Sequence, residues 1–145
     1  MKELQEIGNR REEKILKELL EMYPYEQGYS VYRNATPKAP DFVIVTRNDG
    51  FIILVAECTN YDKDSYFSYP RLYRYIKTLS SYNGNLERVL VVSYPDNFRM
   101  IGKYKSWTYK GIKHNSVYTD SQCIEYAQKF LERHRITVWY RYCKD

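Results

Sequence analysis

Three acidic residues stand where the apolar pattern of the sequence does not require them. Glu12 borders the apolar face of an amphipathic segment, Asp41 opens an apolar segment, and Glu57 directly follows the apolar run 51–56. A carboxylate at the end of a buried strand is costly unless it is paired or bound to a cation. Two carboxylates on neighbouring strands repel each other unless a cation lies between them. Mg²⁺ or Mn²⁺ is the predicted cation, because these ions prefer oxygen ligands and Mg²⁺ keeps water molecules for a phosphate substrate.

Local patterns predict the elements that must position these acids. Apolar residues recur at helical spacing over 2–22, and Asn48, Asp49 and Gly50 form a hairpin turn signal between two apolar segments. The expected helices cover 2–22, 70–82 and 121–133, and the expected strands cover 29–33, 41–46, 51–56, 88–93 and 136–142. This order predicts an α/β (α+β) domain with a mixed central sheet, in which 51–56 is a central strand.

Length and composition limit the class of protein. The chain has 145 residues, of which 43% are hydrophobic and 28% are charged, so we expect one globular domain. The longest apolar run is 51–56, which is far shorter than a membrane-spanning helix, and the N-terminus lacks the apolar core of a signal peptide. The three cysteines lack zinc-binding spacing. These features predict a reduced, cytoplasmic protein with no membrane partner.

Basic and aromatic residues alternate in the segment 97–119. This segment contains no acidic residue, and five basic residues stand there among tyrosines and a tryptophan: Arg99, Lys103, Lys105, Lys110 and Lys113. Basic side chains interleaved with stacking rings are typical of a nucleic-acid-binding surface, although a solvated loop is the alternative. We therefore expect one domain of residues 1–145, with the acids in 1–95 and this basic segment, a helix and a strand in 96–145.

The order of the acidic residues resembles a known family. Gly8 and Glu12, then Pro40 and Asp41, then the apolar run ending at Glu57, Cys58 and Thr59, resemble the PD-(D/E)xK nuclease superfamily. The resemblance covers residues 8–94 and is closest to the small archaeal Holliday-junction resolvases. It implies a restriction-endonuclease-like fold, in which helices flank a mixed sheet, and Mg²⁺-dependent cleavage of double-stranded or branched DNA by a homodimer.

The resemblance also implies roles for individual residues. Asp41, Glu57 and the main-chain carbonyl of Cys58 would bind the metal, and Glu12 would help to hold the metal or a water molecule. The lysine of the family motif is replaced by Thr59, which can bind water but carries no charge. Lys77 is the first candidate for a replacement cation, ahead of Lys63 and Lys38.

The main hypothesis is therefore a metal-dependent endonuclease, with Glu12, Asp41, Glu57, Thr59 and Lys77 as its catalytic residues. Its expected DNA contacts come from Arg71, Arg74, Lys103, Lys105, Lys110 and Lys113.

Thr59 also motivates an alternative hypothesis, in which a nuclease-fold protein binds nucleic acid or a protein partner without cutting. In a third hypothesis, a tyrosine-rich surface binds another protein and the acids are incidental, since Asp41 alone is typical of a turn and Glu57 alone of a strand end that reaches water.

Overall fold

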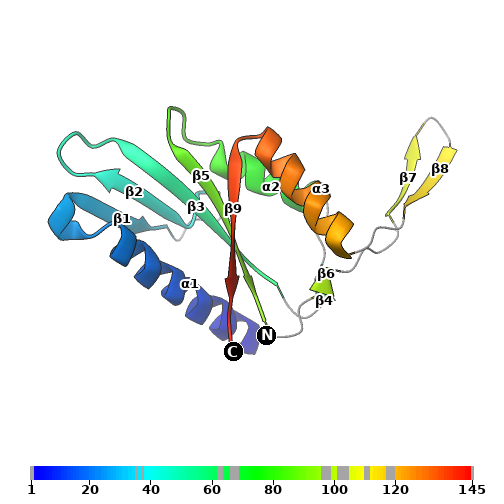
Figure 1. Cartoon of the computed structure of the whole chain (residues 1–145), viewed down its shortest axis with the longest axis horizontal. Helices are drawn as coiled ribbons and strands as arrows, with labels where there is room; N and C mark the ends of the chain where they lie inside the picture. Colours follow the sequence, from blue (N-terminus) through cyan, green and yellow to red (C-terminus); the bar gives the residue numbers. More distant parts are fainter. Residues whose placement is uncertain are drawn as a thin grey trace.

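The computed structural model in Figure 1 describes residues 2–34, 36, 38–61, 64–65, 69–95, 99–100, 105–109, 112–116 and 120–144. Its helices are α1 (Lys2–Met22), the short 3-10 helix η1 (Tyr25–Gln27), α2 (Tyr69–Leu79) and α3 (Asp120–Arg133). Its strands are β1 (Tyr29–Arg33), β2 (Phe42–Thr46), β3 (Ile52–Asn60), β4 (Asp64–Ser65), β5 (Glu87–Tyr94), β6 (Arg99–Met100), β7 (Lys105–Tyr109), β8 (Ile112–Ser116) and β9 (Ile136–Tyr142).

Five of these strands form one mixed sheet in the order β1-β2-β3-β5-β9. Strand β2 runs antiparallel to both β1 and β3, whereas β5 is parallel to both β3 and β9. The C-terminal strand β9 therefore completes the sheet that the N-terminal part of the chain begins. This arrangement confirms the predicted α+β domain with a mixed sheet and the central place of β3.

Helices cover both faces of the sheet (Figure 1). On one face α1 packs on apolar side chains of the strands, and the buried residues there are Ile15, Leu19, Phe42, Ile44, Leu54, Ala56, Val89 and Val91. On the other face α2 and α3 pack on the alternate side chains, and the buried residues there include Val43, Val55, Leu72, Tyr75, Leu79, Leu90, Val92, Ala127, Leu131 and Ile136. Because β-strand side chains alternate between faces, each of these strands contributes to both layers of the core.

The expected apolar strand 51–56 differs from β3 at both ends. Phe51 lies in the turn before the strand and is 68% exposed, although it was expected to be buried. Glu57 was expected to follow the strand, but β3 continues to Asn60. The extension arises because β3 keeps pairing with β5 as far as the Asn60–Ser93 pair. Residues 57–60 are too polar to predict a strand, and their pairing with the distant strand β5 is what gives them this conformation.

The segment after β5 contains more regular structure than the sequence predicted. Strands β7 and β8 form an antiparallel hairpin within the basic segment, and β6 pairs with β4 in a separate two-stranded sheet. Figure 1 shows the β7–β8 hairpin set apart from the five-stranded sheet. Lys105 pairs with Ser116 and Lys113 with Thr108 in this hairpin, whereas Lys103 and Lys110 lie outside the described residues.

Two arginines connect α1 to the edges of the sheet. Arg33, at the end of β1, forms ion pairs with Glu12 and Glu13, and Arg141 of β9 forms one with Glu18 at 2.6 Å. Strands β1 and β9 are the two edge strands. The helix is therefore held across the sheet from one edge to the other, in addition to its apolar contacts.

A buried arginine anchors the first half of α1. Arg11 is only 2% exposed, and its Nη1 donates to the main-chain oxygens of Tyr61 at 2.9 Å and Ser93 at 3.4 Å. The amide of Tyr61 donates to the same Ser93 oxygen at 2.9 Å. Arg11 thus attaches α1 to the place where β3 and β5 end, and it fixes the position of the neighbouring Glu12.

Replacing Arg11 with methionine should destabilise the fold, because it removes these hydrogen bonds from a buried site. We expect the free energy of unfolding, measured by urea denaturation, to fall by about 2–3 kcal/mol. The adjacent Arg10 is exposed, so Arg10→Met is a matched control that should change this free energy by less than about 0.5 kcal/mol. Equal stability of the two variants would contradict the anchoring role of Arg11.

Candidate functional site

The candidate site lies where β2 and β3 separate. Their last antiparallel pair joins Phe42 to Ala56, and the next residues along the two strands are Asp41 and Glu57. Beyond this pair β3 continues beside β5 alone. Asp41 and Glu57 are therefore neighbours in the structure, as the hairpin predicted. They lie just beyond the point where β2 stops pairing with β3.

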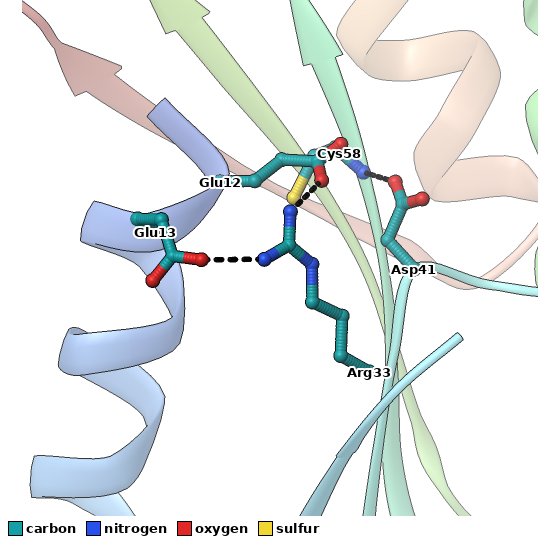
Figure 2. Close-up of polar contacts among 5 residues, drawn as sticks. All are labelled: Glu12, Glu13, Arg33, Asp41 and Cys58. Carbon is teal, nitrogen blue, oxygen red and sulfur yellow. Dashed lines mark hydrogen bonds and ion pairs between the residues drawn. The ribbon is translucent and has the colours of Figure 1, made fainter. Parts of the chain in front are cut away.

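A main-chain hydrogen bond holds Asp41 against β3, beside Glu57. Oδ2 of Asp41 accepts a hydrogen bond of 2.7 Å from the amide of Cys58, as Figure 2 shows. The carboxyl group of Asp41 is also a close neighbour of Glu57 and raises the pKa of that group. Two neighbouring carboxyl groups disfavour the state in which both are negative. The pair is therefore a half-buried acid dyad.

The environment of Glu57 favours the protonated form of its carboxyl group. Burial, together with the neighbouring carboxyl group of Asp41 and its charge, raises the pKa of Glu57 from 4.5 to about 9. A protonated Glu57 can donate its hydrogen to the Asp41 carboxylate. A divalent cation would replace this proton, because it favours the ionised form of both groups.

Glu12 approaches Cys58 from α1, but its carboxylate is already paired with the guanidinium of Arg33. Nη2 of Arg33 lies 2.7 Å from Oε2 of Glu12, and Nη1 lies 2.7 Å from Oε1 of Glu13. In Figure 2 the guanidinium of Arg33 reaches from β1 to both glutamates, and Cys58 lies between Glu12 and Asp41. The sequence analysis did not anticipate the role of Arg33.

The pKa of the Cys58 thiol is affected by burial and by all of these charges. Burial raises its pKa, the negative charges of Asp41, Glu12 and Glu57 raise it further, and the positive charge of Arg33 lowers it. The acids named from the sequence are thus gathered around one residue of β3. This environment favours the protonated thiol over the thiolate.

The three acids do not form a single metal-binding group. Among the residues that the structure describes, no three Asp, Glu, His or Cys side chains come together as a set that could hold a metal ion. Cys58 packs with the α1 cluster, whereas the next residue, Thr59, contacts α2. Glu57 and Thr59 therefore share the α2 face, opposite the face that α1 covers. The side-chain ligands available for a metal are Asp41 and Glu57.

Thr59 is part of a polar network with α2. Its hydroxyl lies 2.5 Å from the hydroxyl of Tyr75 and accepts a hydrogen bond of 2.7 Å from Nη2 of Arg71. Nε of Arg71 also donates to the hydroxyl of Tyr75. The guanidinium lies over the ring of Tyr61, 4.3 Å from its centre. A cation therefore does contact Thr59, where the resemblance implies a lysine, but it is Arg71 and not the expected Lys77.

The expected replacement cations lie elsewhere. Lys77 is exposed near the C-terminal end of α2, and Lys38 is exposed in the turn before β2. Lys63 lies outside the described residues. Among the candidate DNA-binding residues, Arg74 is exposed on α2, beside the ring of Tyr75. It therefore presents a positive charge on the outer surface of the helix that carries Arg71.

Comparison with known proteins found no protein family, curated protein or solved structure that matches this chain. In the described part of the chain, no helix is long and apolar enough to cross a membrane.

Proposed function

We propose that this protein is a Mg²⁺-dependent nuclease that hydrolyses DNA phosphodiester bonds and has a restriction-endonuclease-like fold. The observation that carries the proposal is the half-buried dyad of Asp41 and Glu57. The mixed sheet with helices on both faces agrees with the fold that the resemblance implies. The resemblance also suggests branched DNA, such as a Holliday junction, as the substrate and a homodimer as the active form.

The residues of the dyad fit a hard divalent cation. Two neighbouring carboxyl groups supply, once ionised, the negative charge that Mg²⁺ or Mn²⁺ requires, and the carbonyl of Cys58 is a third oxygen donor. Two carboxylates and a carbonyl leave further coordination positions for water and a phosphate oxygen. When bound, the metal would make a coordinated water more acidic and offset negative charge on the phosphate.

The side chains of the dyad would orient the attacking water. In hydrolysis the water oxygen bonds to phosphorus while the bond from phosphorus to the leaving sugar oxygen breaks. The water gives up a proton to a carboxylate of the dyad, and the leaving oxygen takes up a proton from solvent. Asp41 is well suited to this role, because the amide of Cys58 fixes the direction of its carboxylate.

The proposal is tested with labelled DNA of three kinds: a linear duplex, a single strand and a four-way junction. Each is incubated with the wild-type protein in Mg²⁺, in Mn²⁺ or in EDTA, and the products are separated on a denaturing gel. We expect cleavage in either metal and none in EDTA, with the junction as the preferred substrate. The absence of cleavage with all three substrates in both metals would overturn the proposed activity.

A second function has one specific observation in its favour. Thr59 occupies the position of the motif lysine, so the protein could bind nucleic acid without cutting it. In that case the same gels would show no product, while binding would weaken steeply with added salt, because phosphate contacts release counterions. Binding that changes little with salt would favour a protein partner instead.

A further inference from the structure

We propose that Arg71 supplies the positive charge of the active site, with Thr59 and Tyr75 holding its guanidinium where it can contact the scissile phosphate. This inference rests on the proposed nuclease function and names a residue for the role that the motif lysine would fill.

The position of Arg71 follows from its contacts. It lies in the first turn of α2, and it donates from Nη2 to the hydroxyl of Thr59 at 2.7 Å and from Nε to the hydroxyl of Tyr75. The two hydroxyls are themselves 2.5 Å apart. These three side chains therefore contact one another, and the two hydrogen bonds restrain the direction of the guanidinium.

Aromatic rings support the same guanidinium. Its central carbon lies 4.3 Å from the centre of the Tyr61 ring and 5.8 Å from that of Tyr75. Such contacts attract a cation and are stronger when water is partly excluded. Arg71 is half-buried, whereas Arg74, one turn along the same helix, is exposed. The guanidinium of Arg71 is therefore held in place by its neighbours, whereas that of Arg74 lies on the surface.

The guanidinium of Arg71 lies on the same face of the sheet as the side chain of Glu57. Thr59 follows Glu57 by two residues in β3, so both side chains belong to the α2 face. Thr59 is only 3% exposed, and Arg71 reaches it from α2. The cation is thus held at the strand position of the motif lysine, beside the strand residue that carries the second acid.

An arginine can perform the chemistry that this position requires. Its guanidinium stays charged at all relevant pH values and presents five N–H donors in one plane. A donor from this plane to a non-bridging oxygen would stabilise the negative charge that the phosphate carries as the bond to the leaving oxygen breaks. Thr59 is then a positioning residue, which acts through Arg71 rather than on the substrate.

The test compares cleavage of the four-way junction by Arg71→Met and by the control Arg133→Met, which replaces an exposed arginine in the last turn of α3 that is not among the expected DNA contacts. We expect Arg71→Met to lower kcat about a hundredfold with less than about a threefold change in KM, since the contact acts mainly on the transition state. Arg133→Met should keep both kcat and KM within about twofold of the wild type. The double variant Thr59→Lys with Arg71→Met should recover at least a tenfold increase in kcat over Arg71→Met.

The rescue separates a chemical role from a structural one. A lysine at position 59 restores a charge at the site but not the hydrogen bonds of Arg71 with Tyr75. An unchanged kcat in Arg71→Met, or a loss of kcat that the double variant does not recover, would overturn the inference.

A second measurement does not depend on cleavage. The NMR signal of the Arg71 Nε–H group should shift when a short DNA duplex is added in EDTA. An unchanged signal in a protein that binds the duplex would overturn the inference, even if the wild-type protein does not cut. Failure of the proposed function is recognised separately, by the lack of wild-type cleavage.

Discussion

Replacing Asp41 with asparagine should lower the rate of metal-dependent cleavage by about a thousandfold or more, which corresponds to about 4 kcal/mol of transition-state stabilisation. Asparagine keeps an oxygen that can accept the hydrogen bond from the amide of Cys58, so the junction of β2 and β3 should remain intact. The substitution removes the negative charge of Asp41, which the bound Mg²⁺ requires. The rate is measured with the labelled four-way junction in Mg²⁺, under single-turnover conditions.

Asp49→Asn is a matched control for this variant. Asp49 also accepts a hydrogen bond from a main-chain amide, that of Phe51 at 3.1 Å, but it lies in the exposed hairpin at the other end of β2. Its replacement should leave the cleavage rate within about twofold of the wild type. If a folded Asp41→Asn protein cuts as fast as Asp49→Asn, the dyad is not the metal site.

The stability of the metal-free protein should decrease as the pH rises from 5 to 9. The pKa of Glu57 is about 9 in the folded protein and 4.5 in the unfolded chain. Between these values the folded state keeps a proton that the unfolded state releases, so raising the pH favours unfolding. One pKa unit corresponds to about 1.4 kcal/mol, and water screening at this half-buried group reduces the effect, so we expect a loss of about 2–3 kcal/mol.

The loss is measured by urea denaturation in EDTA at several pH values, with the Glu57→Gln variant beside the wild type. Glutamine cannot ionise, so the variant should lack this part of the pH dependence. Glu26→Gln is the control, because Glu26 is exposed in η1, and it should retain the wild-type slope. A Glu57→Gln protein with the wild-type slope would show that Glu57 does not hold the proton.

Added Mg²⁺ should act in the opposite direction. It competes with the proton for the carboxyl groups, so it should stabilise the wild-type protein more at pH 8.5 than at pH 5.5. When Mg²⁺ is added to the Glu57→Gln variant at pH 8.5, the free energy of unfolding should increase less than it does for the wild type. Equal stabilisation of both proteins at both pH values would contradict a metal site at the dyad.

The sheet could be predicted from the sequence because its strands are marked locally. Apolar runs such as 52–56 and 89–92 are bounded by turn residues, and α1 shows a clear helical spacing over 2–22. The length of β3 could not be predicted, because Glu57 to Asn60 are held in a strand by β5, which is about thirty residues away in the chain. Long-range pairing of this kind leaves no local signal.

The same distinction applies to the candidate site. Asp41 and Glu57 could be placed together because a short hairpin joins their strands. Arg33 could not be assigned to Glu12, because the two residues are 21 positions apart and meet only when α1 packs on the sheet. Arg71 had a signal, since it stands four residues before Tyr75 in the predicted helix 70–82, but its contact with Thr59 depends on how α2 docks on β3.

The place of β9 has a consequence for how the protein could diversify. Because β9 pairs with β5, the chain that leaves the sheet at Tyr94 returns to it through α3, which begins at Asp120. The basic hairpin is therefore an insertion whose two ends are both fixed by the domain core. The entropic cost of closing such a loop changes slowly with its length. The inserted segment can therefore be lengthened, shortened or exchanged while the carboxylates of the sheet stay in place.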